Sequence, residues 1–256
     1  MLSAEQRVSL EISHWAAWSG GVATREKWIA LFEGAAVADP DASPSLEFLP
    51  ALQRRRFSRL SRMALNVAHQ SLVAIPGSPH LVFSSRYGEY AVTYHLLSAL
   101  AKGEPLSPAA FSMSVHNTGA GVCTMVQGLT GHSGAIAAGP DSLEMAVLDC
   151  WMLLASNETD DVLMVFADQP LPLAYQQDDS VPTGGFALAL RLALPRAGGQ
   201  PKETLSLGWM AGGGCQDCAT RGGGIRDLLQ LLLGYSRGYR RPCGRLEWSW
   251  KYHAAA

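Results

Sequence analysis

A strand–helix–strand segment in the middle of the chain constrains the fold most. Small residues fill 134–138, the predicted helix 143–155 is apolar on almost every side, and 162–167 is the unbroken apolar run VLMVFA. A helix that is apolar all round is buried all round, and an uninterrupted apolar strand is typical of a sheet covered on both faces. Because strand, buried helix and strand form a parallel right-handed crossover, the segment predicts an α/β layered domain with its central helix enclosed between sheets.

The remaining periodicities complete this layered domain. Helical spacing recurs over 45–72, 87–102 and 225–233, and short apolar runs predict strands at 81–83, 186–194 and 205–210. Trp248 and Trp250 are spaced as on one face of a further strand. The DxxE pattern of Asp141 and Glu144 predicts a capping box at the start of the central helix.

Charge and composition exclude several classes of protein. Twenty basic and 22 acidic residues give a net charge of -2, which argues against a dedicated nucleic-acid binder. No apolar run approaches the roughly 18 residues of a membrane span, and we expect no secretory leader. We therefore expect one cytoplasmic globular domain over residues 1–256. Only 16% of residues are charged, against roughly 25% in an average domain, which indicates a surface partly covered by a partner.

Short chemical motifs are few. There is no dinucleotide-binding GxGxxG, P-loop or HExxH pattern. Cys215 and Cys218 form a CxxC in a glycine-rich segment, and a zinc site there would need two more ligands, for which Cys243 and His253 are candidates. The simpler interpretation is a loop with two free thiols. We expect no metal and no cofactor.

An ordered set of segments resembles the N-terminal half of β-ketoacyl synthases over roughly residues 45–195, with a divergent extension over 196–256. The stretch Val115 to Gly119 is similar to chain-length factors, and within the family the chain most resembles the short chain-length-factor subunit of aryl polyene synthesis. The resemblance implies a thiolase-like fold and obligate pairing. The segments are RRRFSRLSRMAL (54–65), SVHNTGAG (114–121), GLTGHS (128–133), the apolar helix and VLMVFAD (162–168).

The family's nucleophile is missing from its expected place. Active ketosynthases carry a cysteine at a strand-to-helix elbow, and the family's spacing puts that position at Pro140, between Gly139 and Asp141. Proline offers no nucleophilic atom, so no thiolate can hold an acyl chain there. The family draws its catalytic histidines from its second half, for which the chain shows no matching segment. Asp141 and Ser142 are interpreted as helix-capping residues, and Cys123 and Cys150 as core thiols.

The resemblance also implies partner contacts. In chain-length factors the region before the Asn-Thr-Gly turn crosses the dimer and closes the end of the partner's acyl tunnel. Phe111, Met113, Val115 and His116 are therefore gate candidates, although they could equally be core or interface residues. A bulky gate stops chain growth because packed interiors do not accommodate extra methylenes cheaply.

Three arginines, Arg55, Arg59 and Arg62, are candidates for docking an acidic acyl carrier protein, although arginines in such a helix are more often structural.

The resulting hypothesis is a non-condensing subunit that pairs with a full-length β-ketoacyl synthase and receives no cofactor. Two alternatives stay open. One is a minimal acyltransferase or condensing enzyme with an unrecognised Cys or Ser nucleophile. The other is a binding module built on the CxxC motif.

Overall fold

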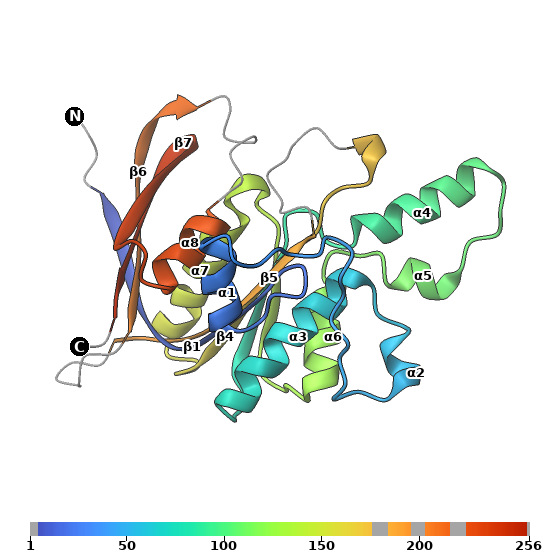
Figure 1. Cartoon of the computed structure of the whole chain (residues 1–256), viewed down its shortest axis with the longest axis horizontal. Helices are drawn as coiled ribbons and strands as arrows, with labels where there is room; N and C mark the ends of the chain where they lie inside the picture. Colours follow the sequence, from blue (N-terminus) through green and yellow to red (C-terminus); the bar gives the residue numbers. More distant parts are fainter. Residues whose placement is uncertain (1–4, 176–183, 196–202, 216–223, 255–256) are drawn as a thin grey trace.

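The computed structural model describes residues 5–175, 184–195, 203–215 and 224–254. They form one seven-stranded sheet in the order β3-β2-β4-β5-β1-β6-β7 (Figure 1). Strands β2, β3 and β4 are mutually parallel, and the other neighbours pair antiparallel. The strands are β1 (Gln6–Trp18), β2 (His80–Ser84), β3 (Ser133–Ile136), β4 (Val162–Asp168), β5 (Phe186–Ala193), β6 (Thr204–Cys215) and β7 (Gly238–His253).

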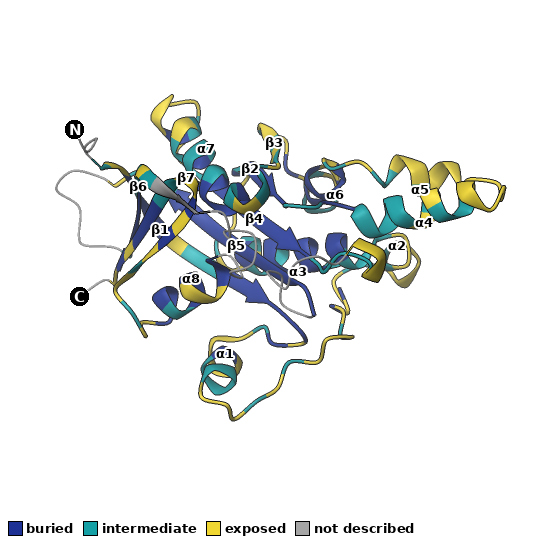
Figure 2. Cartoon of the chain, turned by 90° about the horizontal axis from the view of Figure 1, so that it is seen from above, coloured by how far each residue is buried: buried dark blue, intermediate teal, exposed yellow. Residues whose placement is uncertain are grey.

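Helices cover both faces of the sheet, so the predicted α/β layered class is confirmed. Helices α3 and α6 pack on one face, and α1, α7 and α8 pack on the other (Figures 1 and 2). The elements are α1 (Arg25–Phe32), α2 (Ala51–Arg54), α3 (Arg59–Ala74), α4 (Tyr90–Ala101), α5 (Pro108–Ser112), α6 (Thr118–Gln127), α7 (Ser142–Ala155) and α8 (Ile225–Leu232), with the 3₁₀ turns η1 (Gly139–Asp141) and η2 (Leu173–Tyr175). None of the helices in the described segments has the length and apolar character needed to cross a bilayer.

The central helix α7 follows the prediction in position but not in full burial. Ala146, Val147, Cys150 and Leu154 are buried against the sheet and α8. Met152, however, is 54% exposed. Burial on all sides was therefore a wrong expectation, because the described residues form a single sheet and leave part of the outer face of α7 uncovered.

Two elements differ from the sequence pattern. The glycine-rich segment after Asn117 is the helix α6, whose Gly119 packs so tightly that a Cβ would lie 2.3 Å from the Phe83 ring. Close packing thus outweighs the low helix propensity of glycine. The helix predicted over 45–72 is confined to α3 and the short α2, and loop fills the rest.

Candidate functional site

The elbow between β3 and α7 is the first functional feature. Gly139, Pro140 and Asp141 form η1 directly before α7, and Gly139 adopts a positive φ of 56° that favours glycine. The hydroxyl of Ser84, the last residue of β2, donates to the Ser142 carbonyl over 2.8 Å. The elbow therefore lies at the carboxyl ends of the parallel strands, where open α/β sheets place their functional groups.

Ser142, the first residue of α7, does not act as the predicted cap, because its hydroxyl bonds the turn before the helix and its proton is already donated there. Its buried hydroxyl donates to the Gly139 carbonyl over 2.7 Å and accepts from the Ala138 amide over 3.0 Å. Asp141, the N-cap residue, makes no side-chain cap bond. The predicted capping box of Asp141 with Glu144 is therefore wrong, because both carboxylates are engaged by a different partner.

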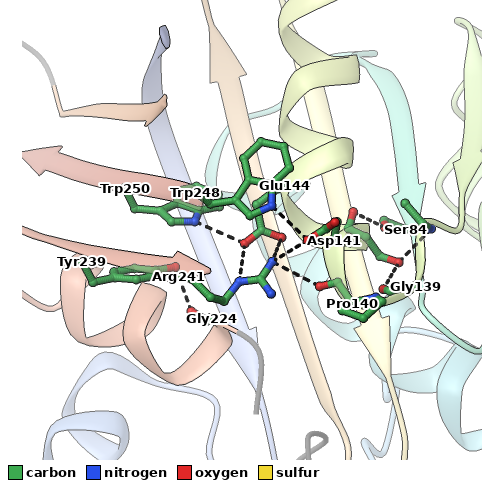
Figure 3. Close-up of polar contacts among 12 residues, drawn as sticks. Ser84, Gly139, Pro140, Asp141, Glu144, Gly224, Tyr239, Arg241, Trp248 and Trp250 are labelled. Carbon is green, nitrogen blue, oxygen red and sulfur yellow. Dashed lines mark hydrogen bonds and ion pairs between the residues drawn. The ribbon is translucent and has the colours of Figure 1, made fainter. Parts of the chain in front are cut away.

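That partner is Arg241 of β7 (Figure 3). Its Nε donates to Glu144 Oε1 over 3.0 Å, and its Nη2 lies 2.7 Å from Glu144 Oε2 and 3.1 Å from Asp141 Oδ1. Nη2 also donates to the Pro140 carbonyl over 3.3 Å. Burial raises the pKa of Glu144, and the facing guanidinium opposes that shift. A forked ion pair of this kind fixes geometry as well as charge.

Two tryptophans complete the attachment of β7 to the elbow. Trp248 Nε1 donates to Asp141 Oδ1 over 2.9 Å, and Trp250 Nε1 donates to Glu144 Oε1 over 3.4 Å. Both indoles are buried, as expected for a shared strand face. The elbow is therefore occupied by the chain's own C-terminal strand, an arrangement we call the elbow lock (Arg241, Glu144, Asp141, Trp248 and Trp250).

The described thiols are not poised as nucleophiles. Burial raises the pKa of Cys123 to about 12 and that of Cys150 well above its ordinary value. Cys243 lies beside the elbow, but burial and a hydrogen bond with Asp141 raise its pKa to about 12. Reactive cysteines instead have lowered pKa values near cations or helix N-termini, so these positions fit structural thiols.

The structure does not allow Cys243 and His253 to complete a zinc site together. Cys243 and His253 are ten residues apart on β7, or roughly 33 Å along an extended strand, so they cannot share one ion. Cys218 lies outside the described residues, and only the backbone of Cys215 is described.

Three of the four gate candidates lie on an arm that projects from the body, formed by α4, α5 and the segment up to Val115, and His116 follows directly after it (Figure 1). Neither α4 nor α5 buries a residue. Phe111 and Val115 are 64% and 48% exposed. Met113 packs against the core beside α3, and His116 Nε2 lies 2.8 Å from the Ser85 carbonyl oxygen. Phe111 and Val115 are therefore exposed, whereas Met113 and His116 contact the body of the same chain.

The end of β4 supports the root of the arm. Asp168 is buried and accepts a hydrogen bond from the Ser85 hydroxyl over 2.7 Å and from the Arg86 amide over 2.9 Å. Burial raises the pKa of Asp168 to about 6, although the hydrogen bonds from Ser85, Tyr87 and Arg86 oppose the shift. Nothing in the sequence singled out Asp168 beyond its place at the end of an apolar strand.

The arginine candidates differ in availability. Arg59 Nη2 donates to the carbonyls of Ala42 and Gly184 over 2.8 and 2.7 Å, and Arg62 Nε donates to the Pro44 carbonyl over 3.0 Å. These two guanidinium groups hold loops of their own chain. Arg55 is exposed, so it remains the candidate of the three that a carrier protein could reach.

Asp168 predicts a pH dependence of stability. Because its folded pKa is raised from 3.8 to about 6, its contribution to the free energy of unfolding is full below about pH 4 and is lost as the pH rises through 6, a change of about 3 kcal/mol. The stability of the wild type relative to Asp168→Asn should therefore fall by that amount between pH 4 and 7. Urea titrations across this range measure it, and a difference that stays constant or grows would contradict the assignment.

Comparisons with known proteins agree with this architecture. The family model described as "Beta-ketoacyl synthase, N-terminal domain" matches residues 28–251, a wider range than the segments that carry the sequence resemblance. The chain is similar to a chain in the solved complex of the ketosynthase ApeO with its chain length factor ApeC from Xenorhabdus doucetiae. The identity is 27% and the TM-score 0.76, covering 95% of this chain and 99% of that one.

Two more distant structures share the fold. The ishigamide ketosynthase/chain length factor is 16% identical with a TM-score of 0.59, covering 77% of this chain and 66% of that chain. A β-ketoacyl synthase from Burkholderia phymatum STM815 is 12% identical with a TM-score of 0.56, covering 73% and 59%. No curated protein matches the sequence. The predicted thiolase-like fold class is thereby confirmed.

Proposed function

The chain belongs to the family of β-ketoacyl synthase N-terminal domains, and from this premise we propose that it is a non-condensing, chain-length-factor-like subunit. It pairs with an active β-ketoacyl synthase in the cytoplasm and shapes the tunnel that holds the growing acyl chain, in aryl polyene biosynthesis. This chain contributes to the wall of the tunnel, and the partner carries the catalytic thiol.

The uncovered arm is the observation that carries this proposal. Between Tyr90 and Asn117 the only charged residues are Lys102 and Glu104, next to the turn between α4 and α5. Five large apolar side chains of the arm are each at least 40% exposed: Leu97, Leu100, Leu106, Phe111 and Val115. A projecting apolar surface of this kind marks a protein interaction site, and its depletion in charge is typical of an interface core.

The elbow supports a role without condensation. Its central residue is Pro140, its Ser142 hydroxyl donates to the Gly139 carbonyl, and the neighbouring Cys243 has a raised pKa. A condensing enzyme needs a thiolate to hold the acyl chain and donors to stabilise developing charge. The elbow lock instead fills this place with the chain's own Arg241 and Trp248.

The comparisons support pairing with a ketosynthase. Two of the similar structures are described as a ketosynthase with a chain length factor. The matched chain of the Xenorhabdus complex is covered to 99%, so it is about as short as this one, whereas the Burkholderia synthase is covered to only 59%. We propose that the carrier protein delivers acyl groups to the complex, with Arg55 as this chain's candidate contact.

The gate hypothesis is tested by changing the size of Phe111. We expect Phe111→Ala, in a complex with the cognate β-ketoacyl synthase, to lengthen the product by at least one extension cycle, because the vacated volume admits further methylenes. Phe111→Trp should shorten it. Mass spectrometry of the released chains reads both changes.

Leu106→Ala is the matched control, because Leu106 is also exposed on the arm but lies in the turn between α4 and α5. It should leave product length unchanged. Unchanged length in Phe111→Ala, Phe111→Trp and a Val115→Ala variant would overturn the gate, while a chain that elongates acyl thioesters without a partner would overturn the function itself.

A further inference from the structure

The root of the arm is tied to the body by an unusual concentration of polar contacts. Asp168 Oδ1 accepts from Ser85 Oγ over 2.7 Å, from the Arg86 amide over 2.9 Å and from the Tyr87 amide over 3.3 Å. The Arg86 amide also lies 3.2 Å from Oδ2. One buried carboxylate at the end of β4 therefore organises the whole loop that leads into α4.

The same loop holds the returning segment of the arm. The Gly88 amide donates to Ser85 Oγ over 2.7 Å, and the Ser85 carbonyl oxygen lies 2.8 Å from His116 Nε2. Gly88 has a φ of 57°, and a Cβ there would lie 3.0 Å from the His116 ring. Ser85 thus links Asp168 on one side to His116 on the other, so a single carboxylate fixes both the start and the end of the arm.

Two further residues, Glu89 and Thr93, tie the first turn of α4 to its surroundings. Buried Glu89 accepts hydrogen bonds from the hydroxyls of Ser61 of α3 and of Ser58, the N-cap residue of that helix, both over 2.6 Å. Thr93 Oγ1 donates to the Ser114 carbonyl over 3.3 Å, which joins α4 to the segment after α5. The arm is therefore uncovered along its length but fixed at its root, as expected of a rigid lever rather than a loose loop.

We propose that Asp168 is a positioning residue of the arm, which sets where Phe111 and Val115 stand in the partner's tunnel and thereby controls product length without touching the acyl chain. This inference rests on the proposed function. The lever is long, because the twelve residues of α4 span about 18 Å. A tilt of about 10° at the root would move the far end of α4 by about 3 Å, and packed interiors respond to the volume of a single methylene.

The chemistry of the loop explains why an amide cannot replace the carboxylate. An ionised carboxylate only accepts hydrogen bonds, and Ser85, Arg86 and Tyr87 all present donors to it. In Asp168→Asn the side-chain NH₂ takes the place of one carboxylate oxygen and adds donors to a cluster that already consists of donors. An NH₂ at the place of Oδ2 would face the Arg86 amide, which lies 3.2 Å from that oxygen in the wild type, so two donors would oppose each other and the loop should open more often.

The test is hydrogen exchange and product analysis on the complex with the β-ketoacyl synthase. In Asp168→Asn, exchange over residues 85–117 should accelerate about thirtyfold, and the product-length distribution should broaden or shift. The matched control is Asp161→Asn just before β4, where the carboxylate pairs with Arg191 at the opposite end of the strand. It should leave product length and the relative protection of 85–117 unchanged.

The possible results separate the two proposals. Selective acceleration together with altered length in Asp168→Asn supports the inference. Acceleration that Asp161→Asn reproduces, or none at all, overturns the positioning role. Unaltered length in Asp168→Asn, in a complex where Phe111→Ala lengthens the product, also overturns the inference, whereas unaltered length in both variants overturns the proposed function.

Discussion

Leu100→Glu is expected to weaken the complex with the β-ketoacyl synthase by at least about a hundredfold. Leu100 is 61% exposed on α4 and lies on the charge-poor arm. Pairing would bury this side chain, and a leucine contributes roughly 1.5–3 kcal/mol when fully buried. A carboxylate placed there must also lose its water. The sum exceeds the 2.8 kcal/mol that a hundredfold change in Kd requires. Titration of the tagged synthase by interferometry measures it.

The stability of the isolated chain separates binding from folding. Because Leu100 is exposed, its substitution should leave the free energy of unfolding within about 0.5 kcal/mol of wild type. Val73→Glu is the control, since Val73 is 66% exposed near the C-terminal end of α3, away from the arm. It should bind normally. If both variants weaken binding to the synthase equally, or if neither weakens it, the arm is not part of the interface.

Arg241→Met is expected to destabilise the chain by about 3–5 kcal/mol. It removes the partner of Glu144, whose side chain is 1% exposed in the ion pair. Removing one member of a buried pair leaves an uncompensated charge. For a chain of this size the melting temperature should fall by roughly 10 °C. Calorimetry at neutral pH gives the comparison.

A double variant and a variant of a neighbouring residue test whether the loss of stability comes from the broken ion pair of Arg241. Glu144→Gln combined with Arg241→Met removes the stranded charge and should recover part of the lost stability. Arg240→Met changes the adjacent residue, which pairs with Glu247 at the surface, and should have no measurable effect. If Arg240→Met and Arg241→Met destabilise equally, the elbow lock does not hold β7 in place.

The sequence predicted the elements whose burial is set by local pattern. The predicted strand 162–167 and the predicted apolar helix 143–155 correspond to β4 and α7, because both patterns are typical of packing against a sheet. The position of the missing nucleophile at Pro140 stays a prediction from the family's spacing, and a proline there has no nucleophilic atom. These features need no knowledge of distant contacts.

The elbow lock could not be predicted, because Arg241 and Glu144 are 97 residues apart. The DxxE spacing therefore predicted a local capping box, whereas in the folded chain both carboxylates pair with Arg241. Strand β1 was missed for a related reason. Val8, Leu10 and Ile12 alternate with polar neighbours, but the alternation is interrupted at the bulge between Ile12 and His14. Likewise, the helical pattern of α4 predicts a helix but cannot show that its apolar face lacks a cover.

Intact mass spectrometry of the complex, loaded with an acyl thioester donor, tests the central claim most directly. If the chain is a non-condensing partner, the added acyl mass will appear on the synthase alone, and this chain will keep its unmodified mass. An acyl adduct on this chain, at Ser142, Cys243 or any other residue, would contradict the account.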